Sequence, residues 1–152
     1  MIRFFGGRVM TLANGIETQD IEVWTEGSKI VFVGKPKAEE LDGKVFEREY
    51  DLKGNLLMPS FKNAHTHSAM TFLRSYADDM PLQDWLFKQI FPMEAKLDGE
   101  KVYWLTKLAI LEYLTTGCTA AFDMYFELDD YVKACIESGF RSVLCGAVSG
   151  DK

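Results

Sequence analysis

The spacing of hydrophobic and polar positions changes near residue 58 of the chain. Before it, three short segments that mix apolar and polar residues, 21–25, 29–34 and 45–52, are candidate strands. Turn signals stand around them, at Asn14-Gly15, Glu26-Gly27 and Lys53-Gly54. Short runs punctuated by such turns are typical of β-strands. In the first run, Ile21, Val23 and Thr25 alternate with Glu22 and Trp24, which predicts a half-buried strand. Residues 1–58 therefore predict a small antiparallel β unit.

After Pro59, helical and strand patterns alternate. Residues 61–65, 119–124 and 141–148 read as short strands. Residues 81–91 and 100–116 predict helices, and the second of these carries Val102, Leu105, Ala109 and Tyr113 on one face, with Trp104, Leu108 and Leu111 beside them. A third helix is predicted by the i, i+3, i+4, i+7 and i+8 spacing of apolar positions from Leu128 to Ile136, ending at Gly139. The order β-α-β-α-β indicates a parallel sheet with helical crossovers.

Composition and charge narrow the class of protein. The 152 residues contain 17 Lys and Arg against 23 Asp and Glu, a net charge of -6, which disfavours nucleic acid or an anionic membrane as a partner. We find no apolar run long enough to span a bilayer and no secretory leader, so we expect a cytoplasmic protein. Three cysteines, Cys118, Cys135 and Cys145, lack the spacing of a metal or redox motif and predict buried, reduced thiols.

The two histidines of the chain, His65 and His67, are the candidates for chemistry. Side chains two apart on a strand project from the same face, so these imidazoles can bind one divalent metal ion. A catalytic metal site needs at least three protein ligands, and this chain has no third histidine. The alternative is a hydrogen-bonded pair at a strand end. The position favours the metal reading, because sites in parallel β/α folds lie at the carboxyl ends of strands.

Several motifs resemble one enzyme family. Residues 57–67, LMPSFKNAHTH, resemble the signature of the amidohydrolase superfamily. Residues 69–71, 76–82, 85–86, 117–119 and 122–125 are similar to its methylthioadenosine/S-adenosylhomocysteine deaminase and chlorohydrolase branch. The resemblance extends from the first strand to about Gly150.

This resemblance implies an α/β fold, made of the first three β/α units of a metal-dependent (β/α)8 barrel preceded by part of a small β-sandwich. Residues 1–58 would belong to the sandwich and residues 59–152 to the barrel. His65 and His67 would be metal ligands, with zinc expected and iron, manganese or nickel able to replace it. The implied reaction is hydrolytic deamination of an adenine nucleoside such as methylthioadenosine or adenosine by metal-bound hydroxide. The resemblance places no catalytic residue other than metal ligands in this chain.

The resemblance also implies substrate-binding residues. Glu94 matches a position that accepts hydrogen bonds from ribose hydroxyls, although a solvated carboxylate at a helix end is the alternative. Trp85 matches a pocket-lining position and could equally be a core tryptophan. Asp123 would end the second barrel strand facing the site, in a supporting role, and Asp78-Asp79 would order a loop. One departure stands out: Cys145-Gly146 occupies the place of a Ser-Arg pair, so the chain lacks an arginine for a carboxylate tail.

The length of the chain limits these expectations. A complete barrel needs about 250 residues, and only three barrel strands fit here. We therefore expect the chain alone to be inactive, to bind metal weakly and to self-associate through unfinished barrel edges. Two alternatives are a related amidohydrolase acting on another aminated or chlorinated heterocycle, such as a triazine or guanine, and a non-catalytic truncated fragment.

Overall fold

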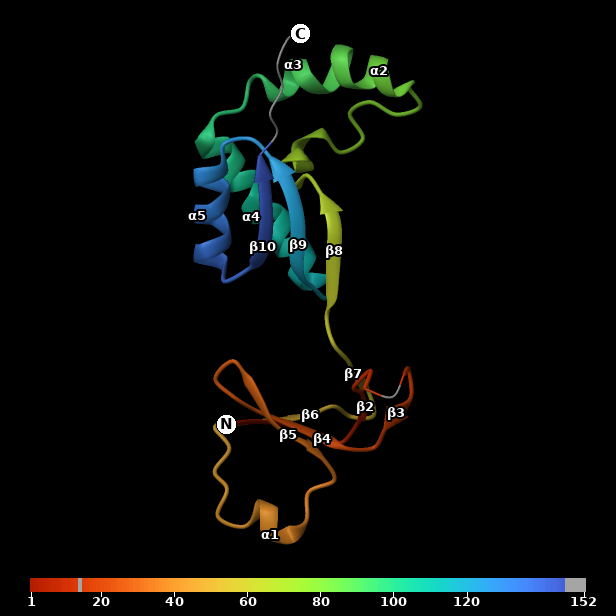
Figure 1. Cartoon of the computed structure of the whole chain (residues 1–152), viewed down its shortest axis with the longest axis vertical. Helices are drawn as coiled ribbons and strands as arrows, with labels where there is room; N and C mark the ends of the chain where they lie inside the picture. Colours follow the sequence, from red (N-terminus) through yellow and green to blue (C-terminus); the bar gives the residue numbers. More distant parts are fainter. Residues whose placement is uncertain (14, 147–152) are drawn as a thin grey trace. The chain divides into compact units, whose positions relative to one another are not determined.

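The computed structural model describes residues 1–13 and 15–146 and divides the chain into two compact units, Met1–Pro59 and Ser60–Lys152 (Figure 1). The predicted turn at Asn14 and the last two residues of the predicted strand 141–148 lie outside the described residues. No helix in the described part of the chain is long and apolar enough to cross a bilayer.

The first unit contains two small sheets. One has the strand order β5-β4-β1-β6, formed by Lys29–Gly34, Glu22–Glu26, Ile2–Phe5 and Arg48–Asp51. The other has the order β3-β2-β7, formed by Thr18–Gln19, Arg8–Met10 and Leu56–Leu57. A single helical turn, α1, occupies Ala38–Leu41.

The prediction of an antiparallel unit is wrong in part, because both sheets are mixed. β6 pairs in parallel with β1, and β7 pairs in parallel with β2. Parallel neighbours need a long connection, so this pairing joins segments far apart in the chain. Local turn signals carry no information about such non-local pairing. The sequence pattern also missed β1 and β2 and predicted β6 too long.

The strand β4 departs from the predicted alternation. Val23 and Trp24 point to opposite faces of the sheet, yet they are 7% and 3% exposed. The Trp24 ring stacks on Phe32 with centroids 4.1 Å apart, and its Nε1 donates to Glu22 at 2.9 Å. Aromatic neighbours therefore cover the face that a simple alternation would leave to solvent.

The second unit contains the predicted parallel sheet. β8 (Phe61–Thr66), β9 (Cys118–Tyr125) and β10 (Arg141–Gly146) lie in the order β10-β9-β8, and both pairings are parallel. The crossovers contain α4 (Gly99–Thr115) and α5 (Leu128–Ser138). The predicted β-α-β-α-β order is thus confirmed. The three strand arrows in Figure 1 point the same way, toward the segment that contains α2 and α3.

Local sequence signals explain where these two helices begin and end. The Asp98 carboxylate accepts a hydrogen bond from the Lys101 amide at 3.0 Å, which pairs one of the free amides in the first turn of α4. Gly117 and Gly139 follow α4 and α5 with φ of 83° and 63°. Glycine adopts this left-handed conformation without the steric cost that a side chain adds.

The core of the second unit lies on one face of its sheet. Val102 and Ile110 of α4 and Tyr131 and Cys135 of α5 pack with Ala121 of β9. On the opposite face, Phe122 and its paired neighbour Val143 are 47% and 60% exposed. The described residues therefore cover this parallel sheet from one side.

The three cysteines are free thiols. Cys118 and Cys135 are buried as predicted, and burial raises the pKa of the Cys135 thiol. Cys145 is only half-buried, which corrects the prediction for this residue. Its Sγ lies 3.6 Å from the carbonyl oxygen of Asp123 on the neighbouring strand.

Candidate functional site

The two histidines lie at the carboxyl end of β8. Their ring centroids are 4.9 Å apart, and the ring planes are nearly perpendicular. His67 Nδ1 lies 2.8 Å from the carbonyl oxygen of Met124. A carbonyl only accepts, so Nδ1 carries the hydrogen and Nε2 keeps a free lone pair. A backbone contact of this kind fixes the tautomer and orientation of a metal-binding histidine.

A buried carboxylate fixes the backbone next to His67. Asp123 accepts two contacts from the Ser68 amide, at 3.3 and 3.2 Å, and a hydrogen bond from the Ser68 hydroxyl. The Tyr131 hydroxyl of α5 donates to the same carboxylate at 2.5 Å. Because Ser68 follows His67 and Met124 follows Asp123, these contacts join the end of β8 to β9 on both sides of the histidine.

This arrangement corrects the expectation for Asp123. The residue was expected to face the site end of the sheet, but it is 0% exposed and does not line the cavity described below. Asp123 shares a strand face with Tyr125, but its carboxylate is bound to Ser68 and Tyr131 and does not reach the cavity. It supports the site through the backbone.

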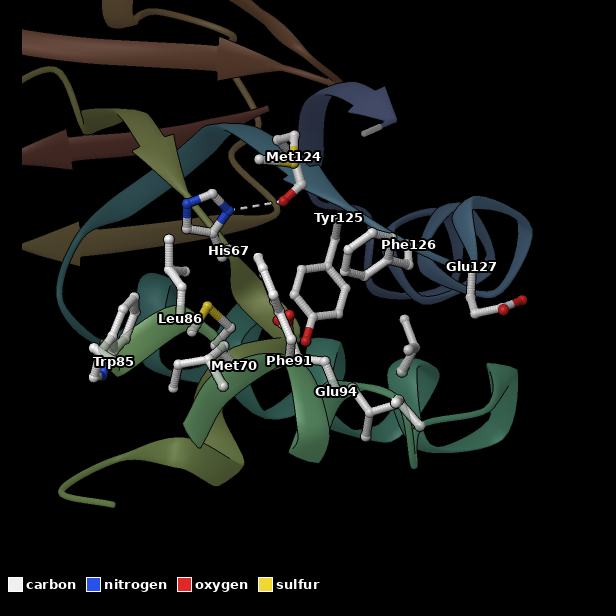
Figure 2. A pocket seen from close by; sticks show the side chains of 14 residues that line it. His67, Met70, Trp85, Leu86, Phe91, Glu94, Met124, Tyr125, Phe126 and Glu127 are labelled. Carbon is white, nitrogen blue, oxygen red and sulfur yellow. Dashed lines mark hydrogen bonds between the residues drawn. The ribbon is translucent and has the colours of Figure 1, made fainter. Parts of the chain in front are cut away.

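A cavity of about 720 Å³ opens beside His67. Its walls come from the segment between Trp85 and Leu97 and from the end of β9, and most of the side chains in Figure 2 are apolar. His67, Trp85 and Glu94, three of the four site residues predicted from the sequence, line this cavity. His65 is exposed and is not among its lining residues.

An irregular helix positions Trp85 and Glu94. The predicted helix 81–91 continues to Glu94 as α2 (Leu82–Asp84), the π-helical segment η2 (Trp85–Ile90) and α3 (Phe91–Glu94). Pro92 lacks an amide hydrogen, so it interrupts the regular α-helical hydrogen-bond ladder. The residue before it, Phe91, bonds through its amide to the Leu86 carbonyl, five residues back. Such π segments widen a helix locally and are frequent at functional sites.

The carboxyl of Glu94 is half-buried in the cavity wall. Burial raises its pKa, because a charged carboxylate loses hydration there, while the Tyr125 hydroxyl and His67 oppose this rise. Tyr125 was not predicted as a site residue. Its place directly after Met124, at the carboxyl end of a predicted strand, was the available signal.

The donor set matches part of a metal centre. Two imidazoles from one strand suit zinc and similar divalent ions, which take neutral nitrogen ligands. No group of three or more His, Cys, Asp or Glu side chains in residues 1–13 and 15–146 is arranged to hold a metal ion. The described residues therefore fit two positions of a metal site and leave the others to further ligands.

Comparison with known proteins identifies the family. Residues 56–150 match the amidohydrolase family. The chain belongs to this family.

Two curated relatives are deaminases. The 5-methylthioadenosine/S-adenosylhomocysteine deaminase of Desulfitobacterium hafniense is 42% identical over 130 residues, which cover 86% of this chain and 30% of the relative. The 5'-deoxyadenosine deaminase of Methanospirillum hungatei is 56% identical over 94 residues, which cover 62% of this chain and 21% of the relative. The chain thus spans less than a third of either relative.

A crystal structure gives the same picture of the fold. The adenosine deaminase of Xanthomonas campestris with bound zinc superposes with a TM-score of 0.86 at 33% sequence identity. The match covers 93% of this chain and 33% of that protein. The chain therefore has the α/β fold of an amidohydrolase part.

Proposed function

We propose that this amidohydrolase chain belongs to an enzyme that removes the amino group of an adenine nucleoside by hydrolysis. The observation that carries the proposal is the meeting of His67, Trp85 and Glu94 around one cavity at the carboxyl ends of parallel strands. The deaminase relatives and the zinc-bound adenosine deaminase support it.

The second unit would form the first three β/α units of a (β/α)8 barrel. Its uncovered sheet face, with Phe122 and Val143, is the face that becomes the interior when such a sheet closes. Residues 1–58 would contribute part of a small β-sandwich. The parallel order of β8, β9 and β10 supports the assignment of the second unit to a barrel.

His65 and His67 would provide two ligands to a divalent metal ion. Zinc is supported by the similar adenosine deaminase structure, and iron, manganese and nickel accept the same ligands. When bound, such a metal lowers the pKa of water and so supplies a nucleophile near neutral pH. The chain's own contribution is orientation, because the Met124 carbonyl holds His67 with Nε2 free.

The cavity lining would select a nucleoside. A carboxylate accepts hydrogen bonds from both hydroxyls of a vicinal diol, so Glu94 suits the ribose. The flat ring of Trp85 would pack against the base or the sugar. Met70, Leu86 and Phe91 provide apolar surface that excludes water from bound substrate.

The end of β10 favours a neutral substrate. Gly146 and the half-buried Cys145 offer no cation for a carboxylate tail at the point where β10 ends. Adenosine, 5'-deoxyadenosine and methylthioadenosine are therefore preferred over S-adenosylhomocysteine. Comparable turnover of the neutral and the zwitterionic nucleosides would remove this preference.

The test uses the protein made from the complete reading frame that contains these residues. Ammonia release is measured with the four nucleosides above and with guanine, and chloride release is measured with a chlorinated triazine. We expect turnover of the neutral adenine nucleosides, and at least a ~100-fold loss of kcat/KM in His65→Ala and His67→Ala. Asp129→Asn, an exposed change on α5, is the matched control and should keep full activity.

Two outcomes decide against the proposal. A wild-type protein that releases no ammonia from any adenine nucleoside overturns it. Turnover of guanine or the triazine in preference to adenosine replaces it with the second reading of the same site, hydrolysis of another heterocycle.

The incomplete ligand set gives a separate test on residues 1–152 alone. Two imidazoles bind zinc weakly compared with a complete three- or four-ligand site. We expect zinc to be removed from this chain by gel filtration or a mild chelator. Tight, stoichiometric zinc in a monomeric preparation of these residues would contradict this expectation.

A further inference from the structure

The hydroxyl of Tyr125 is an orphan in a wall of the candidate site. Tyr125 is 2% exposed, and its hydroxyl oxygen is buried without a hydrogen-bond partner among the described residues. Buried polar groups are nearly always paired, so an exception needs an explanation. Asp123, two residues earlier on the same strand face, has partners for both carboxylate oxygens.

The cavity that Tyr125 lines also contains the Glu94 carboxyl. Both residues line the same cavity, and Figure 2 shows the Tyr125 ring reaching from the end of β9 toward the segment that carries Glu94. The two groups affect each other's protonation: the hydroxyl opposes the rise in the pKa of Glu94, and the carboxylate raises the pKa of Tyr125. Burial is the largest cause of the raised pKa of Tyr125, so this hydroxyl stays protonated and acts as a donor.

We propose that Tyr125 is a positioning residue that donates a hydrogen bond to the Glu94 carboxylate and holds it for the ribose hydroxyls of a bound nucleoside. This inference rests on the proposed function. It gives the orphan hydroxyl a partner in the substrate complex. Hydrogen bonds of this kind are often incomplete in ligand-free structures and tighten when substrate binds.

The geometry gives the two residues different mobility. Tyr125 ends a strand, and its ring packs in the core with Val102, Ile110 and Tyr131. Glu94 is the last residue of a four-residue helix after a π-helical segment, and its side chain has three rotatable bonds. A fixed donor on the strand therefore restricts the movable carboxylate. A carboxylate can accept from Tyr125 and from both ribose hydroxyls at once.

The test uses Tyr125→Phe in the complete protein, because phenylalanine keeps the packed ring and removes only the hydroxyl. We expect the KM for adenosine to rise about 10-fold with kcat within about 2-fold, as for loss of one hydrogen bond in binding. The KM for 2',3'-dideoxyadenosine, which lacks the diol, should not change. Tyr103→Phe, which removes a hydroxyl bonded to Glu137 at 2.5 Å on the helical surface, is the matched control.

A double-mutant cycle with Glu94→Gln tests the pairing directly. If Tyr125 acts through Glu94, Tyr125→Phe should add less than about 2-fold in the Glu94→Gln background. Calorimetry of inosine binding to the metal-free protein compares the wild type, the two single variants and the double variant without turnover. Equal KM changes for adenosine and dideoxyadenosine, or independent effects of the two substitutions, would overturn the inference.

The outcomes separate this inference from the function on which it rests. A wild-type protein that deaminates adenosine but shows no Tyr125–Glu94 coupling disproves the positioning role alone. A wild-type protein that binds inosine without deaminating adenosine disproves the activity and leaves the coupling to be decided by calorimetry. Failure to bind any nucleoside overturns both.

Discussion

Each unit of the chain pairs a largely buried carboxylate in a different way. In the first unit, Glu22 meets a cation: Arg3 donates to its two oxygens at 2.6 and 2.7 Å, and Trp24 donates at 2.9 Å. In the second unit, Asp123 accepts hydrogen bonds from the Ser68 amide and from the hydroxyls of Ser68 and Tyr131. One carboxylate is paired with an opposite charge, and the other with neutral donors.

The two carboxylates also join different parts of the structure. The Arg3–Glu22 pair joins neighbouring strands β1 and β4, and Arg3 also lies 4.6 Å from the Phe5 ring centroid. Asp123 joins β9 to α5 and to the residue after the metal-ligand candidate His67. A buried carboxyl group with no cation beside it depends on every hydrogen-bond partner being in place. We therefore expect changes at Asp123 to cost more than changes in the ion pair.

The largest effect is expected for Asp123→Ala. It leaves the Ser68 amide without its acceptor and leaves the Ser68 and Tyr131 hydroxyls only their neighbours Tyr113 and Ser142, at 3.0 and 3.2 Å. We therefore expect the free energy of unfolding to fall by about 3–5 kcal/mol. Urea unfolding of the chain measures this loss. If the alanine variant does not fold, Asp123→Asn should fold with a smaller loss, because it keeps one acceptor oxygen. The exposed Asp129→Asn serves as control, and a loss at Asp123 no larger than this control would break the comparison.

A smaller loss is expected when one partner of the ion pair is removed. Arg3→Met leaves the Glu22 carboxylate partly buried with only the Trp24 donor, and we expect about 2–3 kcal/mol of destabilisation. Replacing both partners, as Arg3→Met with Glu22→Leu, should restore much of the lost stability, because neither charge is then left partly buried without its partner. Additive losses in the double variant, measured by urea unfolding, would contradict this.

A still smaller loss is expected for Tyr131→Phe. Asp123 keeps its Ser68 donors, so we expect about 1 kcal/mol, the usual net contribution of one hydrogen bond. A loss as large as that of Asp123→Ala would mean that the hydrogen bond from Tyr131, and not those from Ser68, provides most of the stabilisation by this network. Thermal unfolding of the two variants side by side gives the answer.

The smallest effect is expected from pH. The Arg3 guanidinium lowers the pKa of Glu22 below its ordinary value of 4.5. A lowered pKa in the folded state contributes stability that is present above the unfolded pKa and is lost as pH falls through the folded pKa. The protection factors of amides in β1 and β4, measured by hydrogen exchange, should therefore fall below about pH 4. Glu22→Gln should weaken this dependence, and an unchanged profile in that variant would disprove the assignment.

Local patterns predicted the second unit better than the first. The boundaries of α4 and α5 lie within one or two residues of those predicted, because Asp98, Gly117 and Gly139 mark helix ends through their own backbone preferences. The first unit was predicted less well, since its parallel pairs β1–β6 and β2–β7 depend on contacts between distant segments. Trp24 shows the same limit, because its burial depends on Phe32 of the next strand.

The sequence by itself determined the family, the histidine pair and the order of strands and helices after Pro59. These features follow from residue types at short spacings, which a strand or helix converts directly into a shared face. The residues His67, Trp85 and Glu94 were also chosen from sequence, and the structure brings them to one cavity.

Only the tertiary structure decided how these side chains are held. The contact of His67 with the Met124 carbonyl and the Asp123 network each join atoms from segments that are distant in the chain. The burial of the Tyr125 hydroxyl without a partner among the described residues likewise depends on how such segments pack. Such contacts depend on the register between β8 and β9, where a shift of one residue exchanges the two faces of a strand. No local pattern contains that register, so the sequence predicted the site residues but not their supports.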